Sequence, residues 1–215
     1  MGLRPLADVV SDFQAELDQV TSIFSTCRGH RTVLATPLSY IPTEAGCLVS
    51  LWDAWNRFIR NLLLTSCSGP VQGLSGATYT PAAAMSATTA ISHINRNRRG
   101  TRIKVVAGEP KWFEVAAIAD FTQVLGLGNG QVITSAITST TVLLGPFQVR
   151  NPLEEIRVCR NLVAHKSSGA IAEVIGVVGS GFVDVASHVR TRRYGVEVFS
   201  EWSDACLALA EAAAQ

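Results

Sequence analysis

The sequence has little charge and no excess of either sign. Lys and Arg total 18 against 17 Asp and Glu, and charged residues make up only 16% of the 215 residues. A net charge of +1 excludes a uniformly basic protein that binds nucleic acid by bulk attraction. Hydrophobic residues make up 47%, which excludes a disordered chain, because this much apolar surface offsets the entropy lost on folding. We predict one folded domain over residues 1–215, with any charge-driven function confined to local patches.

Long apolar runs are also missing. The most apolar stretch, 170–185, contains Glu173 and Asp184, whereas a membrane-spanning helix needs about 20 nearly uncharged residues. The N-terminal segment reaches Asp8 without the apolar core of a secretory signal. No membrane partner is predicted, and we expect the protein in the cytoplasm.

The cysteines show no metal-binding pattern. Their number is odd, no Cys-x-x-Cys pair occurs, and no histidine lies near them at metal-ligand spacing. We predict reduced, buried side chains, no metal site and no cofactor. The cysteines are Cys27, Cys47, Cys67, Cys159 and Cys206.

Apolar residues at spacings of three and four predict several amphipathic helices. Gly29 is expected to end the first helix, and Trp52, Trp55 and Phe58 on the second are interpreted as core rather than as a ligand site. The glycines of 126–130 are interpreted as a helix stop, because a dinucleotide-binding loop must follow a strand. The predicted helices span 6–27, 44–66, 110–125, 151–166, 170–178 and 200–213.

The remaining segments are predicted as connections. Residues 68–104 form an insertion or extended connection that includes a basic excursion. Residues 131–144 have strand propensity, but the helical context favours a short helix over 131–139 followed by a loop. The predicted fold class is therefore all-α: an antiparallel bundle of four to five helices with a basic loop excursion.

The 151–166 helix carries the pattern with chemical content. Asn151 is expected as its N-cap and Pro152 as its first residue, with Glu154 closing a capping box. At 100° per residue, Asn161 and His165 are neighbours on the polar face, and Arg160 lies at the boundary.

These three residue types suit phosphodiester chemistry. Histidine moves a proton near neutral pH, arginine holds a phosphate through two parallel hydrogen bonds, and asparagine orients either partner. RNA cleavage by attack of the ribose 2′-hydroxyl requires only proton transfer and charge stabilisation, so no metal is needed. The pattern therefore indicates a site formed by Arg160, Asn161 and His165.

Arg160-Asn161-x-x-x-His165, late in a helical chain, resembles the motif of the HEPN superfamily (higher eukaryotes and prokaryotes nucleotide-binding). The segment 51–58, Leu-Trp-Asp-Ala-Trp-Asn-Arg-Phe, is similar to the aromatic second helix of bacterial members. The sequence departs from some toxins of the family, which have a tyrosine two residues after the histidine, where this chain has Ser167. Control by modification of that tyrosine is therefore not carried over.

The resemblance implies a helical bundle and a homodimer in which two Arg160/His165 motifs face one cleft. It implies a metal-independent endoribonuclease that leaves 2′,3′-cyclic phosphate and 5′-hydroxyl ends, in a toxin, antiviral defence or stress role. Its partners would be RNA and an antitoxin or other regulatory protein. The alternative is a non-catalytic HEPN-like module that binds RNA, a nucleotide or a partner protein.

Structural roles for the same residues stay open. Arg160 pairs with Glu154 or Glu155 in one such interpretation, and His165 serves as a cation at the negative end of the helix dipole. Arg157 and Glu154 are interpreted as a pair on the helix surface. The histidines outside the motif are expected to face solvent, with an RNA contact considered only for the one beside the basic excursion; they are His30, His93 and His188.

Two clusters hold eight of the 18 basic residues. Such clustering in a nearly neutral chain fits a surface that follows RNA phosphates, and equally a solvated loop in an arginine-rich protein. The candidate RNA-binding residues are Arg96, Arg98, Arg99, Arg102 and Lys104 in one cluster and Arg190, Arg192 and Arg193 in the other.

Overall fold

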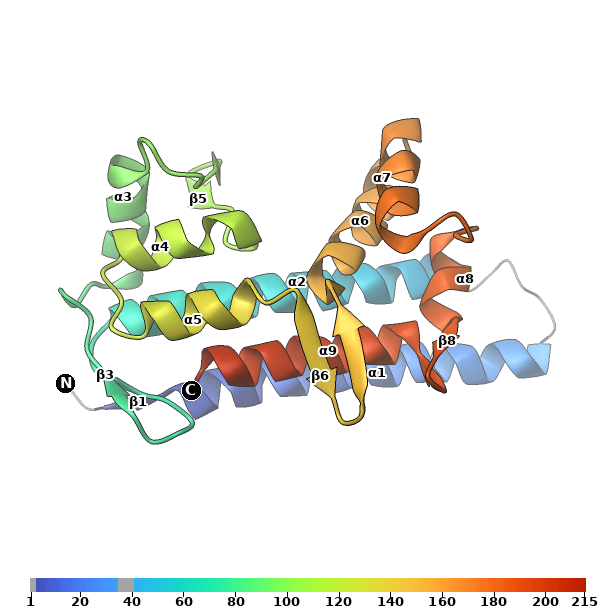
Figure 1. The fold of residues 1–215 in the computed structure, drawn as a ribbon, viewed down its shortest axis with the longest axis horizontal. Helices are drawn as coiled ribbons and strands as arrows, with labels where there is room; N and C mark the ends of the chain where they lie inside the picture. Colours follow the sequence, from blue (N-terminus) through green and yellow to red (C-terminus); the bar gives the residue numbers. More distant parts are fainter. Residues whose placement is uncertain (1–2, 35–40) are drawn as a thin grey trace. The chain divides into compact units, whose positions relative to one another are not determined.

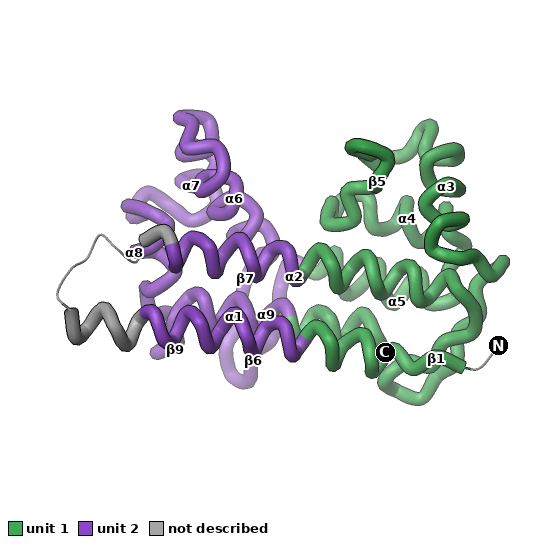
Figure 2. The backbone as a smooth tube through the Cα atoms, turned by 180° about the vertical axis from the view of Figure 1, so that it is seen from behind, with its two compact units in different colours: residues 1–13, 55–139, 207–215 green, residues 14–54, 140–206 purple. Residues whose placement is uncertain are grey.

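The computed structural model describes the backbone of residues 3–34 and 41–215 and the side chains of 3–27 and 43–215. Most of this chain is α-helical, which confirms the helical class (Figure 1). Backbone contacts form two compact units: unit 1 is 1–13, 55–139 and 207–215, and unit 2 is 14–54 and 140–206 (Figure 2). A single domain over 1–215 stays a prediction. The three longest described helices supply residues to both units: α1 (Leu6–Leu34), α2 (Ile41–Cys67) and α9 (Val198–Ala213).

Helix α1 buries the predicted stripe, including Leu6, Phe13, Leu17 and Phe24. Its predicted end at Gly29 is wrong, because the helix continues to Leu34. One glycine inside a helix costs only about 1 kcal/mol, which a long helix with a buried stripe tolerates. The side chain of His30 lies outside the described residues.

Helix α2 confirms that its aromatic residues are core. Trp52, Trp55 and Phe58 are each at most 3% exposed. In unit 1 the ring of Phe13 lies 5.9 Å from that of Trp55 and 4.8 Å from that of Phe58. Aromatic rings at these separations attract each other beyond their buried area, so they stabilise the pairing of the first turns of α1 with the second half of α2.

The rest of unit 1 consists of short elements. Strand β1 pairs in parallel with β2, and β2 pairs antiparallel with β3. Strands β4 and β5 form a separate antiparallel pair. The bounds are β1 (Arg4–Pro5), β2 (Val71–Gln72), β3 (Thr78–Tyr79), α3 (Ala87–Asn97), β4 (Val105–Val106), β5 (Glu109–Pro110), a 3-10 turn (Val115–Ala117), α4 (Ile118–Val124) and α5 (Gly130–Ile137).

Two expectations for this region are wrong. Residues 68–104 are not only a connection, because they contain α3, which is capped by the Ser86 hydroxyl and buries Ala90 and Ile94. The predicted 110–125 helix starts later, because Pro110 belongs to β5 and α-helical geometry begins only at Ile118.

The glycine stop and the short helix after it are confirmed. Gly126 follows the C-cap of α4 with a φ of 60°, in the left-handed region that glycine adopts without strain. Helix α5 then covers the predicted 131–139 segment, ending at Ile137.

The loop predicted after residue 139 is wrong, because the hairpin β6–β7 of unit 2 follows there. Val142 and Val149 are opposite each other and buried, whereas Leu143 is 71% exposed. Gly145, at a φ of 57°, allows the tight turn between the strands. Unit 2 contains β6 (Thr141–Leu144), β7 (Phe147–Arg150), α6 (Pro152–His165), α7 (Ser168–Val178), α8 (Val185–Arg190), β8 (Arg192–Arg193) and β9 (Val196–Glu197), with parts of α1, α2 and α9.

Helix α6 has its predicted bounds but not its predicted cap. Asn151 is the N-cap residue, yet it adopts a left-handed conformation and its side chain makes no capping bond. Its backbone carbonyl accepts from the N–H groups of Glu154 and Glu155. The Glu154 carboxylate binds Arg157, so the expected capping box is absent. Pro152 is the first helical residue, as predicted.

The cysteines are free thiols, and all but the half-buried Cys27 are buried. Burial raises the pKa of Cys47 and of Cys67 to about 11, which keeps both thiols protonated at neutral pH. Within residues 3–34 and 41–215, no helix combines the length and the apolarity needed to cross a membrane.

Candidate functional site

The predicted motif lies on the last two turns of α6. Arg160 and Asn161 are half-buried, and His165 is exposed in the final turn. Lys166 ends the helix in a left-handed conformation, and its N–H donates to the carbonyl of Leu162. The motif therefore sits on a regular helix that packs against α7 and α8 in unit 2.

The two glutamates of α6 form ion pairs with arginines other than Arg160. Arg157 donates to Glu154 at 2.8 and 2.7 Å and to Glu173 of α7 at 2.6 Å. The hydrogen bonds that Arg157 donates to Glu154 outweigh the effect of burial, so the pKa of Arg157 lies above its usual value. The surface pair predicted for Arg157 and Glu154 is confirmed, and it also ties α6 to α7. Glu155 accepts a hydrogen bond from Arg193.

Arg160 consequently pairs with neither Glu154 nor Glu155. Its Nε atom is buried and has no hydrogen-bond partner within the described part of the chain. There, too, the side chains of Asn161 and His165 make no interaction. Within the described residues, therefore, no carboxylate pairs with any of the three motif side chains.

A cavity of about 600 Å³ lies beside this end of α6. Its walls are mostly apolar and include Leu162, Val163, Ile171, Ile175 and Phe182. On α6, Leu162 and Val163 line the cavity and lie between the motif residues Asn161 and His165 in the sequence. The motif residues themselves do not line the cavity. An apolar cavity next to unpaired polar groups suits a ligand with a flat apolar part and a charged part.

The first basic cluster lies in unit 1, at the end of α3 and after it. Arg102 binds Asp120 at 3.3 Å, and Lys104 binds Glu114 at 3.4 Å. Arg96 donates to the carbonyl of Ser92. The two residues between them, Arg98 and Arg99, are exposed and form no ion pair within the described ranges.

The second cluster lies in unit 2 and is largely neutralised. Arg190 lies 3.5 Å from the buried carboxylate of Glu44, and Arg193 binds Glu155 and Glu201. Arg192 is exposed, and no described carboxylate pairs with it. RNA contact by the two clusters stays a prediction, for which Arg98, Arg99 and Arg192 have the most accessible charges.

Arg193 is the centre of a buried polar network that sequence reasoning missed. Its Nη1 and Nη2 donate to the two oxygens of Glu155 at 2.9 and 3.2 Å, and Nη1 also donates to Glu201 at 3.2 Å. Trp202 Nε1 donates to Glu155 at 3.0 Å. Glu155 is 8% exposed and Glu201 is 4% exposed, so two buried carboxylates share one guanidinium.

His188 belongs to the same network, and its predicted solvent exposure is wrong. Its ring packs between Phe182 and Trp202, and its Nε2 lies 3.4 Å from Arg193 Nη2. Burial, followed by the positive charge of Arg193, lowers the pKa of His188. It is therefore neutral at pH 7 and adds no second cation.

The pKa shifts in the network follow from burial and charge. Burial raises the pKa of Glu201, and the opposing effect of Arg193 does not cancel it. For Arg193, burial acts downward, but the hydrogen bonds and charges of Glu155 and Glu201 prevail and its pKa is raised. One signal for the site was present in the sequence: Glu201 interrupts the apolar face of α9, beside Val198 and Trp202.

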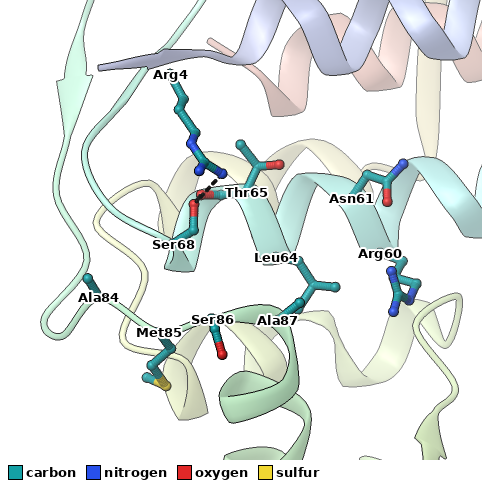
Figure 3. Close-up of a pocket in the computed structure, with 10 residues that line it drawn as sticks. All are labelled: Arg4, Arg60, Asn61, Leu64, Thr65, Ser68, Ala84, Met85, Ser86 and Ala87. Carbon is teal, nitrogen blue, oxygen red and sulfur yellow. Dashed lines mark hydrogen bonds between the residues drawn. The ribbon is translucent and has the colours of Figure 1, made fainter. Parts of the chain in front are cut away.

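Unit 1 contains a second polar cavity, of about 560 Å³, between β1, the end of α2 and the segment before α3 (Figure 3). Arg4 and Arg60 line it together with hydroxyl groups, and no carboxylate belongs to its wall. Arg4 Nη1 donates to Ser68 Oγ at 3.2 Å, and Arg60 Nε donates to Glu109, outside the cavity wall, at 2.8 Å. Its hydroxyl groups come from Thr65, Ser68 and Ser86.

Comparison with protein-family models, with curated proteins and with solved structures finds no match to this chain. No group of three or more histidine, cysteine, aspartate or glutamate side chains among the described residues is arranged to hold a metal ion.

Proposed function

We propose that the protein is a cytoplasmic, metal-independent endoribonuclease of HEPN type. Arg160, Asn161 and His165 form its active site, which leaves 2′,3′-cyclic phosphate and 5′-hydroxyl ends. The observation that carries the proposal is half-buried Arg160, whose buried Nε atom has no hydrogen-bond partner among the described residues although two carboxylates lie on the same helix. A buried charge without a partner is costly, and an RNA phosphate would supply the missing anion.

The reaction needs only the chemistry of these side chains. The ribose 2′-oxygen attacks the neighbouring phosphorus, the bond from phosphorus to the 5′-oxygen breaks, and the cyclic phosphate forms. His165 accepts the 2′-hydroxyl proton, and in a homodimer with both motifs in one cleft the second His165 protonates the leaving 5′-oxygen. Arg160 binds the phosphate oxygens as negative charge develops, and Asn161 orients the phosphate.

The apolar cavity beside α6 supports the same assignment. A nucleobase has two apolar faces, and Phe182 offers it an aromatic ring. The exposed charges of Arg98 and Arg99 in unit 1, and of Arg192 in unit 2, are each suited to a contact with an RNA phosphate. A toxin, defence or stress role and regulation by an antitoxin remain proposals that follow from the family resemblance.

The test is cleavage of end-labelled RNA in excess chelator. Wild-type protein is expected to release 2′,3′-cyclic phosphate ends, and His165→Ala or Arg160→Ala is expected to cleave about 10²-fold more slowly or worse. Arg160→Lys keeps the charge but loses paired hydrogen bonding, so it should restore only part of the rate. Arg150→Gln is the matched control, because it removes an exposed arginine of unit 2 that lies outside the motif and the cavity wall. Equal cleavage by all variants, or loss of cleavage with chelator, contradicts the mechanism.

A second candidate function is phosphate or nucleotide binding without cleavage. The cavity of unit 1 favours it, because two guanidinium groups and three hydroxyls line it without a carboxylate (Figure 3). Titration calorimetry with ADP and with inorganic phosphate tests this function. Arg4→Gln should weaken binding of both ligands about tenfold, whereas Arg192→Gln, in unit 2, should not. Unchanged binding in Arg4→Gln, or none in the wild type, rejects this cavity as the site.

A further inference from the structure

A separate cavity of unit 2 has the chemistry of a cation-binding site. The two hairpins β6–β7 and β8–β9 and the helix α9 enclose about 400 Å³, within the range of small-molecule sites. We call it the hairpin cleft. The lining residues that decide its chemistry are Phe147, Arg193, Tyr194, Val196, Glu201 and Asp204.

The charge of the hairpin cleft is negative in spite of Arg193. Both Nη atoms of Arg193 are already bound, to Glu155, Glu201 and the ring of His188. Its guanidinium is therefore occupied and is not available to an incoming anion. Glu155 and Glu201 both bind this single cation.

Asp204 adds a further carboxylate to the cleft wall. It lies one turn after Glu201 on α9, and none of the described residues pairs with it. Burial raises the pKa of Asp204, and no nearby positive charge counteracts the shift. Two carboxylates of the cleft wall, those of Glu201 and Asp204, thus face one guanidinium that also binds Glu155, and a bound cation would restore the balance.

The mouth of the hairpin cleft is aromatic. The ring of Tyr194 stacks on that of Phe147, with centroids 4.9 Å apart, and Tyr194 is still 63% exposed. Tyr194 also has a φ of 53°, in the two-residue turn completed by Gly195. This conformation is costly for a bulky residue, and hairpin turns of this kind favour asparagine before glycine. Strained backbone at the rim of a cavity is typical of functional positions.

We propose that the hairpin cleft binds a small organic cation, namely a protonated amine on an apolar or aromatic body. The ammonium group would lie between Glu201 and Asp204, and the body would lie against Phe147 and Tyr194, whose ring faces attract cations. The site does not depend on ribonuclease activity. It lies on different elements from the Arg160 motif and takes a ligand of opposite charge.

The probe is 2-phenylethylamine, with 2-phenylethanol as a neutral control of the same shape and phenylacetate as an anionic one. Titration calorimetry should give a Kd on the order of 1 mM for the amine and binding at least about tenfold weaker for both controls. Equal binding of amine and alcohol, preference for the carboxylate, or no binding of the amine up to about 10 mM overturns the proposal.

Two variants locate the site. Asp204→Asn removes an exposed carboxylate, and Tyr194→Asn removes the ring while keeping a residue suited to the turn, so both proteins should fold normally by circular dichroism. Each is expected to weaken amine binding about five- to tenfold. Asp12→Asn neutralises an exposed aspartate of unit 1 and should leave the affinity unchanged. Amine binding that survives in both cleft variants would place the ligand elsewhere and overturn the assignment.

Discussion

Replacing Arg193 by methionine tests the buried network of unit 2 most directly. The change preserves much of the side-chain volume but removes the guanidinium that, among the described residues, binds both Glu155 and Glu201. These carboxylates are 8% and 4% exposed, so water does not replace the lost partner. Removing one member of a buried ion pair costs about 3–5 kcal/mol of unfolding free energy. For a chain of this size, that corresponds to a fall in Tm of about 6–20 °C.

The assay is urea unfolding followed by tryptophan fluorescence and circular dichroism, since Trp202 donates to Glu155 within the network. The matched control is Arg192→Met, which removes an exposed arginine at the neighbouring position of β8 and should change stability by less than about 0.5 kcal/mol. An Arg193→Met protein as stable as this control would refute the assignment of a buried, charge-compensated network.

A rescue variant separates lost charge compensation from lost packing. If the cost arises from orphaned carboxylates, then adding Glu155→Gln and Glu201→Gln to Arg193→Met should recover most of the stability, because neutral amides cost less to bury than charges. Lowering the pH should also narrow the gap between Arg193→Met and wild type, because protonation neutralises the same two groups. Failure of both rescues would indicate that Arg193 acts mainly through packing.

Three further outcomes follow from the described geometry. The pKa of Glu201 is raised above its ordinary 4.5 in the folded state, so its favourable contribution to stability is complete below pH 4.5 and is lost as the pH rises through the raised value. The urea midpoint of the wild type should therefore decline between about pH 4 and pH 8, and Glu201→Gln should make this decline shallower. Gly128→Ala should cost about 1–3 kcal/mol by thermal unfolding, because a Cβ there would overlap the backbone carbonyl of Thr80. Gly176→Ala, inside α7 with open space around it, should instead add about 1 kcal/mol.

The sequence predicts those helices in which an apolar residue recurs every three or four positions over several turns. The stripes of α1 and α2 extend over several turns, so the loss of one position, such as Gly29, shifts a boundary without hiding the helix. Helix α3 was missed because its buried face consists of Ala90 and Ile94 alone. The hairpin β6–β7 was missed because Leu143 places a large apolar side chain on its exposed face, which obscures the alternation of a half-buried strand.

The polar network could not be predicted for a different reason. Glu155 and Arg193 are 38 residues apart, and each resembles an ordinary surface charge within its own segment. Which carboxylate meets which guanidinium depends on how α6, α9 and the β8–β9 hairpin pack in unit 2. Periodicity along one helix does not contain that information. His188 was misassigned in the same way, because its burial comes from Phe182 and Trp202.

Clustering of charge along the chain is therefore a poor guide to charge at the surface. The cluster at 190–193 appears strongly basic in sequence, yet Arg190 and Arg193 meet buried carboxylates from distant segments, and the cleft next to Arg193 is negative. Arg160 stands alone in sequence as the last arginine of α6, and its buried Nε atom has no hydrogen-bond partner among the described residues. Ion pairing in three dimensions therefore decides which positive charges are left for a ligand, and among the described residues it favours Arg160 over Arg193 at the centre of the cluster.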